Sequence, residues 1–462
     1  MDKQQLHNEF LSITSESHPG LTFEEYRDCC VFLLFYHYLC LKYDDALEDQ
    51  YKLSAMVRLA VRGKLQMPAF LKFIEQASPF IHMAGSEYVL TSLSFYQKLL
   101  TVHQLEKQKS YARFFRKLIK KMEAWDSDEL LRENYGDLFE ELLSEFARMK
   151  KDTYVSKPLI SLFRFLFESS GTSVNKVFIP ELQYGILLNT MLTGGKETEI
   201  VGYEERDYFL EIVSILCYMK GYSRDHIHFF HKKEWMDQVD YMEHFDAISI
   251  LKPEGVDPGS FISSVPEWHP VSKLMFTGTK GEFPLLLSAL PLLSDQGMMA
   301  IVVPSALLYR EGKEAQIRRY IVEEAGNLEL VMLLPDHIFH STGQNEVMLF
   351  FKNGRRRDDI MFFDCSDLED FGEEQKEKLL EAWSQHKEVP GFCASIGRET
   401  IRENDYNLNL PRYITRSVKM TEIDLEEKLK RISEIDRELI EIDQKIAMYR
   451  RDLELNLSLT VK

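Results

Sequence analysis

The sequence predicts a chain of three parts: an all-helical region, an α/β region built on a mostly parallel sheet, and a terminal coiled helix. Three observations support this prediction. Apolar residues recur at helical spacing up to about residue 155. After residue 156, short β-branched or apolar runs alternate with helical stretches. The end of the chain carries a heptad-like apolar stripe. We therefore expect domains at residues 1–155, 156–414 and 415–462.

The first part is expected to be helices around a shared core. YARFFRKLIKKMEAW (111–125) and DLFEELLSEFARMKK (137–151) repeat their apolar residues every three or four positions. TFEE (22–25) has the form of a capping box, which predicts a helix start at Thr22. The apolar run at residues 29–43 contains His37 and is shorter than the roughly 20 residues that a membrane span needs. We expect a core helix there, and no membrane partner.

The second part predicts an α/β sheet. Strands are expected at residues 175–179, 198–204, 246–251, 298–304, 328–335, 345–352 and 359–364, and helices at 206–221, 282–297 and 310–326. Alternation of strand and helix indicates a mostly parallel sheet covered on both faces. Ligands of such folds bind outside the carboxyl ends of the strands. The stretch LKPEG (251–255) follows one such strand and is expected at that edge.

The terminal helix carries apolar residues at steps of three and four: Leu425, Leu429, Ile432, Ile435, Leu439, Ile442, Ile446, Tyr449 and Leu453. This spacing is close to a heptad seam, and it predicts a coiled-coil helix that packs against a partner. The alternative is a single helix packed back on its own chain.

Charge and cysteine content restrict the partners and the location. A formal net charge of -18 argues against unaided, sequence-independent binding to DNA or to an anionic membrane. Any contact with nucleic acid is therefore expected to be local or through a partner. The basic runs at residues 113–121 and 355–357 are expected to be solvated faces or turns, as charge runs usually are, and local basic patches are the alternative. The six cysteines lack metal-type spacing and predict reduced thiols in a cytoplasmic protein.

Four histidines, His226, His228, His231 and His244, lie close together in the sequence. A metal site would need accompanying cysteines or tightly spaced acids, which this segment lacks. We expect solvated or hydrogen-bonded histidines and no metal.

The stretch from Phe283 to Lys352, together with NDYNLNLPRYI (404–414), resembles the modification subunit of type I restriction-modification systems, which are adenine-specific DNA methyltransferases. The shared motifs are a glycine, an apolar run and a proline before an arginine-containing helix, then a strand ending in Leu-Pro before a Phe and a Thr-Gly. The resemblance extends over about residues 157–414. It implies a Rossmann-like, S-adenosylmethionine-dependent methyltransferase core behind a helical front domain, with a terminal coiled helix.

The resemblance also implies a cofactor loop, typically Asp-Pro-x-Cys-Gly-x-Gly, whose glycines let the backbone approach the cofactor. This chain has IPELQYG (179–185) there: Ile179 replaces the acid, and Leu182 and Gln183 replace Cys and Gly. In the family the next strand ends in an acid for the ribose hydroxyls, and Glu204 matches it. Gly185 and Glu204 are thus vestigial cofactor residues, and a structural or solvated role is the alternative for Glu204. We expect no cofactor, or S-adenosylmethionine if activity survives.

The family's base-binding loop, Asn-Pro-Pro followed by Phe or Tyr, receives the flipped adenine. Leu251, Lys252, Pro253 and Glu254 stand at those four places. Leu251 offers no acceptor for the exocyclic amine, and Glu254 puts a carboxylate where a ring should stack. No catalytic residue is therefore expected to be intact.

These losses predict a catalytically degenerate modification-subunit-like protein, acting as a structural or DNA-clamping subunit of a methyltransferase or phage-defence complex. Its expected partners are a specificity-subunit-like protein or a catalytic methyltransferase paralogue, bound through the terminal helix, and DNA within the complex. Two alternatives remain open. One is an active adenine methyltransferase with divergent motifs, and the other is a protein-interaction module that no longer binds DNA.

Overall fold

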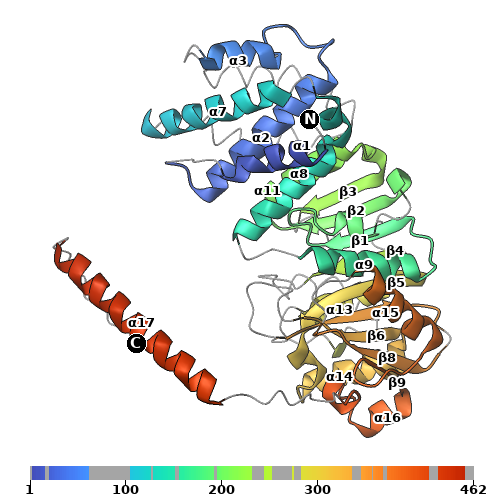
Figure 1. Ribbon diagram of the computed structural model, residues 1–462. Coiled ribbons are helices and arrows are strands. Elements are labelled where there is room, and N and C mark those ends of the chain that lie inside the picture. Colours follow the sequence, from blue (N-terminus) through green and yellow to red (C-terminus); the bar gives the residue numbers. More distant parts are fainter. Residues whose placement is uncertain are drawn as a thin grey trace. The chain divides into compact units, whose positions relative to one another are not determined.

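The computed structural model describes residues 3–15, 20–61, 105–125, 128–150, 156–191, 195–231, 244–251, 273–274, 282–335, 345–355, 357–367, 372–415 and 425–452 (Figure 1). The chain divides into two compact units, Met1–Thr415 and Arg416–Lys462. The domain boundary predicted after residue 155 falls just before the described segment that begins at Ser156, and it stays a prediction.

The helical region precedes the sheet. Its described elements are α1 (Lys3–Leu11), η1 (Ser12–Ser15), α2 (Phe23–Lys42), α3 (Leu53–Val61), α7 (Leu105–Trp125) and α8 (Glu129–Lys150). The capping box predicted at Thr22 is confirmed, with side-chain and backbone bonds exchanged with Glu25. His37 is fully buried within α2, as expected of a core helix. Among the described helices, none is long and apolar enough to cross a membrane.

One nine-stranded sheet follows, in the order β3-β2-β1-β4-β5-β7-β6-β8-β9. Its strands are β1 (Lys176–Pro180), β2 (Glu199–Glu204), β3 (Ile227–His231), β4 (Phe245–Ile250), β5 (Leu293–Pro304), β6 (Leu328–Leu333), β7 (Glu346–Lys352), β8 (Asp359–Asp364) and β9 (Cys393–Gly397). β7 and β9 pair antiparallel with their neighbours, and the other pairs are parallel. The mostly parallel sheet is thus confirmed.

Three details differ from the sequence prediction. β3 and β9 were not predicted as strands. The helix expected at residues 282–297 ends early: α13 (Glu282–Ala289) passes through η7 (Leu290–Leu292) into β5. The helix expected at 310–326 is α14 (Lys313–Arg319), continued by a π-helical turn, Tyr320–Ala325.

Both faces of the sheet are covered, as predicted. Alternate β1 residues show the two cores: Val177 and Ile179 belong to one hydrophobic cluster, and Phe178 belongs to the other. α9 (Lys157–Ser169), α11 (Asp207–Lys220), α15 (Glu373–Gln385) and the front helices contribute to the first cluster. α13, α14 and α16 (Arg398–Glu403) contribute to the second. Short elements complete the unit: α10 (Leu188–Met191), η2 (Gly195–Glu197), η3 (Arg224–His226), η8 (Ser305–Leu308) and η10 (Leu410–Arg412).

The second unit contains one long helix, α17 (Leu425–Asp452). Its apolar stripe is exposed over the residues whose side chains are described: Ile432, Ile435, Leu439, Ile442, Ile446 and Tyr449. The helix expected from the heptad spacing is confirmed, and its coiled-coil pairing stays a prediction.

Candidate functional site

The candidate site lies where the loop after β1 crosses the carboxyl ends of β1 and β2. The backbone N–H groups of Glu181 and Leu182 donate to the Tyr203 carbonyl at 3.0 and 3.1 Å, which fixes the loop against β2. Glu181 and Gln183 adopt φ angles of 116° and 46°. These are left-handed conformations that glycine adopts readily and that bulky residues adopt at a cost. Two residues with large side chains, Glu181 and Gln183, therefore adopt backbone conformations that are typical of glycine.

The side chains of this loop fill space beside β2 and α11. Leu182 is buried against Gly202 of β2, where an added Cβ would lie only 2.5 Å from the leucine Cδ2. The buried Tyr184 ring meets Phe209 of α11 edge-on at 4.8 Å. Ile179, at the place of the family's acid, is also buried. The loop thus uses apolar contacts with its own chain at positions where the family pattern has an acid and small residues.

Gly185, the glycine that survives in the loop, has a structural reason to be glycine. Its φ is 74°, and a Cβ there would lie 3.0 Å from Leu216 and 3.2 Å from Leu188. Left-handed backbone and close packing both disfavour a larger residue. Retention of Gly185 is thus explained without a ligand.

Glu204 ends β2 with a carboxylate that is 3% exposed. One oxygen accepts the backbone N–H of Gln183 at 2.9 Å. The other accepts the backbone N–H groups of Glu205 and Arg206 at 3.0 and 3.1 Å, and the Arg206 Nε–H at 3.1 Å. Both oxygens are therefore engaged by donors of the chain itself.

An arginine from the helical region reaches this loop. Arg27 of α2 is buried, and its guanidinium donates to Asp28 at 2.6 Å and to the Tyr184 hydroxyl at 3.3 Å. Its Cζ also lies 4.3 Å from the centre of the Tyr208 ring. Burial acts to lower the pKa of Arg27, but Asp28 and Tyr184 more than offset it and hold that pKa above its ordinary value. No sequence motif points to Arg27, because 157 positions separate it from Tyr184.

The predicted base-binding loop is described only at its first residue. Leu251 follows β4 and is 8% exposed, with an aliphatic side chain that can neither donate nor accept a hydrogen bond. Lys252, Pro253 and Glu254 lie outside the described residues. At Leu251 the chain therefore offers no side-chain acceptor for an amine.

The histidines that lie close together in the sequence make separate contacts. His228 Nε2 lies 3.8 Å from Glu199, and burial lowers the pKa of His228. His231 Nε2 lies 2.9 Å from the Glu205 carbonyl oxygen. Within the described residues, no group of three or more His, Cys, Asp or Glu side chains could hold a metal ion.

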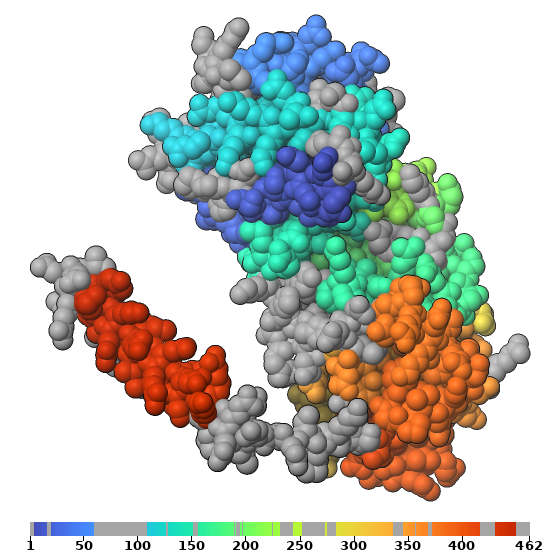
Figure 2. All heavy atoms as spheres, in the orientation of Figure 1, coloured from blue at the N-terminus to red at the C-terminus, as the bar shows by residue number. Residues whose placement is uncertain are grey.

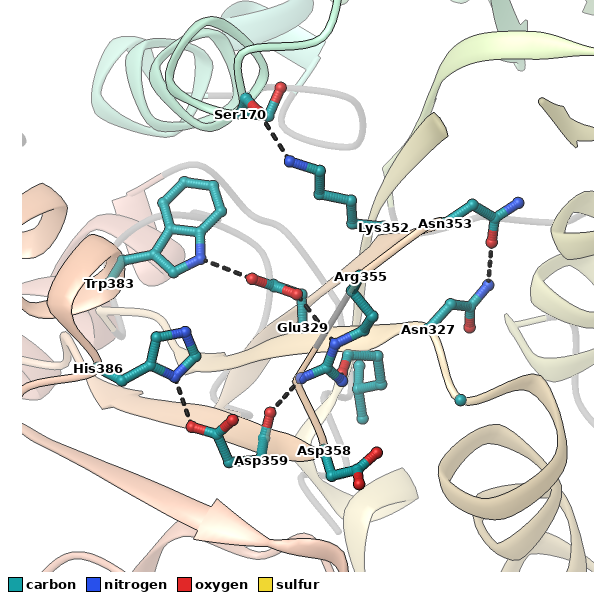
Figure 3. Close-up of polar contacts among 12 residues, drawn as sticks. Ser170, Asn327, Glu329, Lys352, Asn353, Arg355, Asp358, Asp359, Trp383 and His386 are labelled. Carbon is teal, nitrogen blue, oxygen red and sulfur yellow. Dashed lines mark hydrogen bonds and ion pairs between the residues drawn. The ribbon is translucent and has the colours of Figure 1, made fainter. Parts of the chain in front are cut away.

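A second polar cluster lies at the amino ends of β6 and β8, away from the carboxyl edge (Figure 3). The buried Arg355 guanidinium lies 3.1 Å from Glu329, and the Trp383 Nε1–H donates to the same carboxylate at 3.1 Å. Arg355 also donates to the carbonyls of Leu328 and Asp359. Both alternatives given for residues 355–357, a basic patch or a solvated turn, fail for Arg355, whose side chain is 6% exposed and pairs with Glu329.

Comparisons with known proteins agree with this architecture. A family model described as N-6 DNA Methylase matches residues 131–422. The methylase subunit of the type I restriction enzyme MjaVII from Methanocaldococcus jannaschii is 25% identical over 365 residues, covering 72% of this chain and 62% of that protein. The methylase subunit of the type I restriction enzyme MpnII from Mycoplasma pneumoniae is 30% identical over 188 residues, covering 38% of this chain and 34% of that protein.

The alignments thus span less than two thirds of the length of these curated relatives. Among solved structures, the type I restriction-modification methyltransferase subunit from Streptococcus thermophilus superposes with a TM-score of 0.74 at 20% identity. That superposition covers 89% of this chain and 99% of the other. The likeness extends over the helical region and the sheet and concerns the fold.

Proposed function

The chain belongs to the N-6 DNA methylase family, and from that premise we propose that it is a modification-subunit-like protein whose methyltransferase fold no longer transfers methyl groups. The observation that carries the proposal is the contact between Glu204 and the loop after β1. In the family pattern the acid at this strand end serves the cofactor. In this chain its two oxygens accept hydrogen bonds from Gln183, Glu205 and Arg206.

The loop residues do not fit S-adenosylmethionine as the family pattern would hold it. The pattern has an acid where this chain has the buried Ile179, and a glycine where it has Gln183. A cofactor approaching this backbone would meet side chains that a glycine loop lacks. We therefore assign no methyl-transfer step to this chain.

The base-binding position supports the same proposal. Methyl transfer to an adenine amine depends on acceptors that orient the amine toward the methyl group. Leu251 supplies none in place of the amide. Lys252 then puts a cation in place of a proline, and Glu254 puts a carboxylate in place of the stacking ring. The altered cofactor loop and the altered base loop are independent losses on one framework.

We assign this protein a structural or DNA-clamping role within a larger methyltransferase or defence complex in the cytoplasm. The exposed apolar stripe of α17 supports a partner helix, supplied by a specificity-subunit-like protein or by a catalytic methyltransferase paralogue. The six buried, free cysteines are consistent with a reducing compartment. In this scheme the front domain is residues 1–155, the methyltransferase-like domain is residues 156–414, and the helix that binds the partner is in residues 415–462.

The first test is calorimetric titration of S-adenosylmethionine into the purified full-length chain. A modification subunit with the Asp-Pro-x-Cys-Gly-x-Gly loop serves as the control. We expect saturable heat and thermal stabilisation for the control and neither for this chain. Micromolar binding by this chain would contradict the proposal.

An active methyltransferase with divergent motifs is the second candidate. Two observations favour it. Gln183 and Gly185 have the left-handed backbone conformation expected of the glycines in the family's loop, and Glu204 ends β2, where the family has its ribose-binding acid. It requires transfer of labelled methyl groups to DNA when the chain is assembled with its partners. Absence of transfer in every partner combination would eliminate it.

A further inference from the structure

One face of α7 is basic, in a chain whose formal net charge is -18. Its exposed residues at steps of four, four and three are Lys109, Arg113, Lys117 and Lys120. The half-buried Arg116 and Lys121 flank them, and the exposed Glu123 ends the row. Figure 2 shows α7 at the surface of the helical region.

Three basic residues on other helices of the same unit are ion-paired. Arg148 on α8 pairs with Glu145 at 2.5 Å, Arg164 on α9 pairs with Glu168 at 2.7 Å, and Lys376 on α15 pairs with Glu373 at 2.9 Å. Within the part of the chain that the structure describes, Lys109, Arg113 and Lys120 form no ion pair. The charges of Lys109, Arg113 and Lys120 are therefore exposed, and no described carboxylate pairs with them.

The opposite face of α7 indicates which polyanion would fit. Its large apolar residues whose side chains are described are buried: Tyr111, Phe114, Phe115, Leu118, Ile119, Met122 and Trp125. A helix that binds a membrane surface needs an exposed apolar face, and a single-stranded nucleic acid site needs exposed aromatic rings for stacking. α7 presents neither through its described side chains. Its chemistry is that of a phosphate-backbone contact, which needs only cations.

We propose that the basic face of α7, defined by Lys109, Arg113, Lys117 and Lys120, docks against the sugar-phosphate backbone of duplex DNA. The face extends over roughly 16 Å of helix, from eleven steps of about 1.5 Å. A duplex strand carries one phosphate charge per about 3.4 Å of axis, so the face can meet about five phosphates. The choice of a duplex rests on the proposed function, since the family acts on DNA.

The scaffold holds this face in a fixed relation to the candidate site. α7 packs against α3 and α2, and Lys121 donates to Ser12 at 2.7 Å. α2 in turn carries Arg27, which contacts Tyr184 in the loop after β1. A duplex held on α7 is therefore bound to the same compact unit that contains the sheet.

The test compares two triple variants of the full-length chain by fluorescence anisotropy with a labelled duplex of about 25 base pairs, at several salt concentrations. One variant is K109Q/R113Q/K120Q. The matched control is R148Q/R164Q/K376Q, which also removes three positive charges, but from ion-paired positions. Thermal unfolding of both variants checks that the fold is kept.

We expect the slope of log affinity against log salt to become shallower by about three in the α7 variant, about one for each lost phosphate contact. The control should keep the slope of the unaltered chain. Equal losses in both variants, no salt-dependent binding by the unaltered chain, or a preference for anionic lipid vesicles over the duplex would each overturn the proposal. Cofactor calorimetry tests the loss of methyl transfer separately, so the two ideas can fail independently.

Discussion

The backbone N–H of Gln183 donates to the carboxylate of Glu204 at 2.9 Å, and the two residues stand where the family pattern has a loop glycine and a ribose-binding acid. This bond links the loop after β1 to the end of β2. It also places Gln183 at a φ of 46°, a conformation that disfavours residues with a Cβ. The bond and the strain are therefore coupled, and each can be tested by substitution.

Gln183→Gly should relieve the backbone strain at this position. A residue with a Cβ in the left-handed conformation destabilises the folded state by about 1 to 2 kcal/mol. Glycine removes this strain, but its unfolded chain has more conformational entropy, which offsets part of the gain in stability. We expect the free energy of unfolding in urea to stay equal or to rise by up to about 1 kcal/mol. Gln183→Ala is the matched control, because it keeps the Cβ and hence the strain. A glycine variant clearly less stable than the alanine variant would show that the φ angle is not the cost.

Glu204→Gln should destabilise the protein in the absence of any cofactor. The glutamine amide has one acceptor oxygen, so its NH₂ group must face at least one of the N–H donors that now meet a carboxylate. Leaving such buried groups unsatisfied costs about 1 to 3 kcal/mol. The control is Glu168→Gln, which breaks an exposed ion pair with Arg164 and should change stability by about 0.5 kcal/mol or less. Equal urea midpoints for the two variants would mean that Glu204 has no structural role.

The fold was largely predictable because buried strands carry a local signal. β4, for example, is predicted within one residue from its apolar and β-branched run. β3 was missed because only Phe229 of its five residues is buried, which leaves little apolar pattern. β9 was missed because CASIG has small and polar residues at a sheet edge.

The site was predictable only where it is contiguous in the sequence. Replacement of the loop glycine by Gln183 is visible in the printed residues, whereas the left-handed backbone it adopts depends on the hydrogen bond to Glu204. The role of Arg27 could not be predicted from the sequence, since its contact with Tyr184 forms only when α2 packs beside the sheet. Tertiary packing, and not local propensity, decides these features.

Asp359 should contribute to the loss of stability in acid. Its carboxylate accepts from the Ser395 hydroxyl and contacts His386 Nδ1 (Figure 3 shows His386). Burial acts to raise the pKa of Asp359, but hydrogen bonds from Ser395 and His386 outweigh it and lower that pKa below its ordinary value. A lowered pKa in the folded state stabilises the protein above the unfolded-state pKa of about 3.9, and that stability is lost as pH falls through the folded value.

Asp359→Asn should therefore flatten the pH dependence of unfolding below about pH 4. The measurement is the urea midpoint at intervals between pH 6 and pH 3. Asp358→Asn is the neighbouring control, because the Asp358 side chain is 87% exposed and pairs at 3.3 Å with Arg398. If both variants lose stability in acid as steeply as the unaltered chain, the contacts of Asp359 do not contribute to acid sensitivity.

The stripe of α17 should bind a partner through Leu439 and Ile442, which are 53% and 51% exposed and lie on the heptad seam. Burying each would contribute about 1.5 to 3 kcal/mol, so L439D/I442D should weaken the complex at least about a hundredfold. Ile440 is 58% exposed but lies off the seam, and I440D is the matched control that should leave the complex intact. Copurification of partners with the tagged full-length chain measures both. If α17 instead packs on its own chain, L439D/I442D will lower the thermal unfolding midpoint of the isolated protein and leave copurification unchanged.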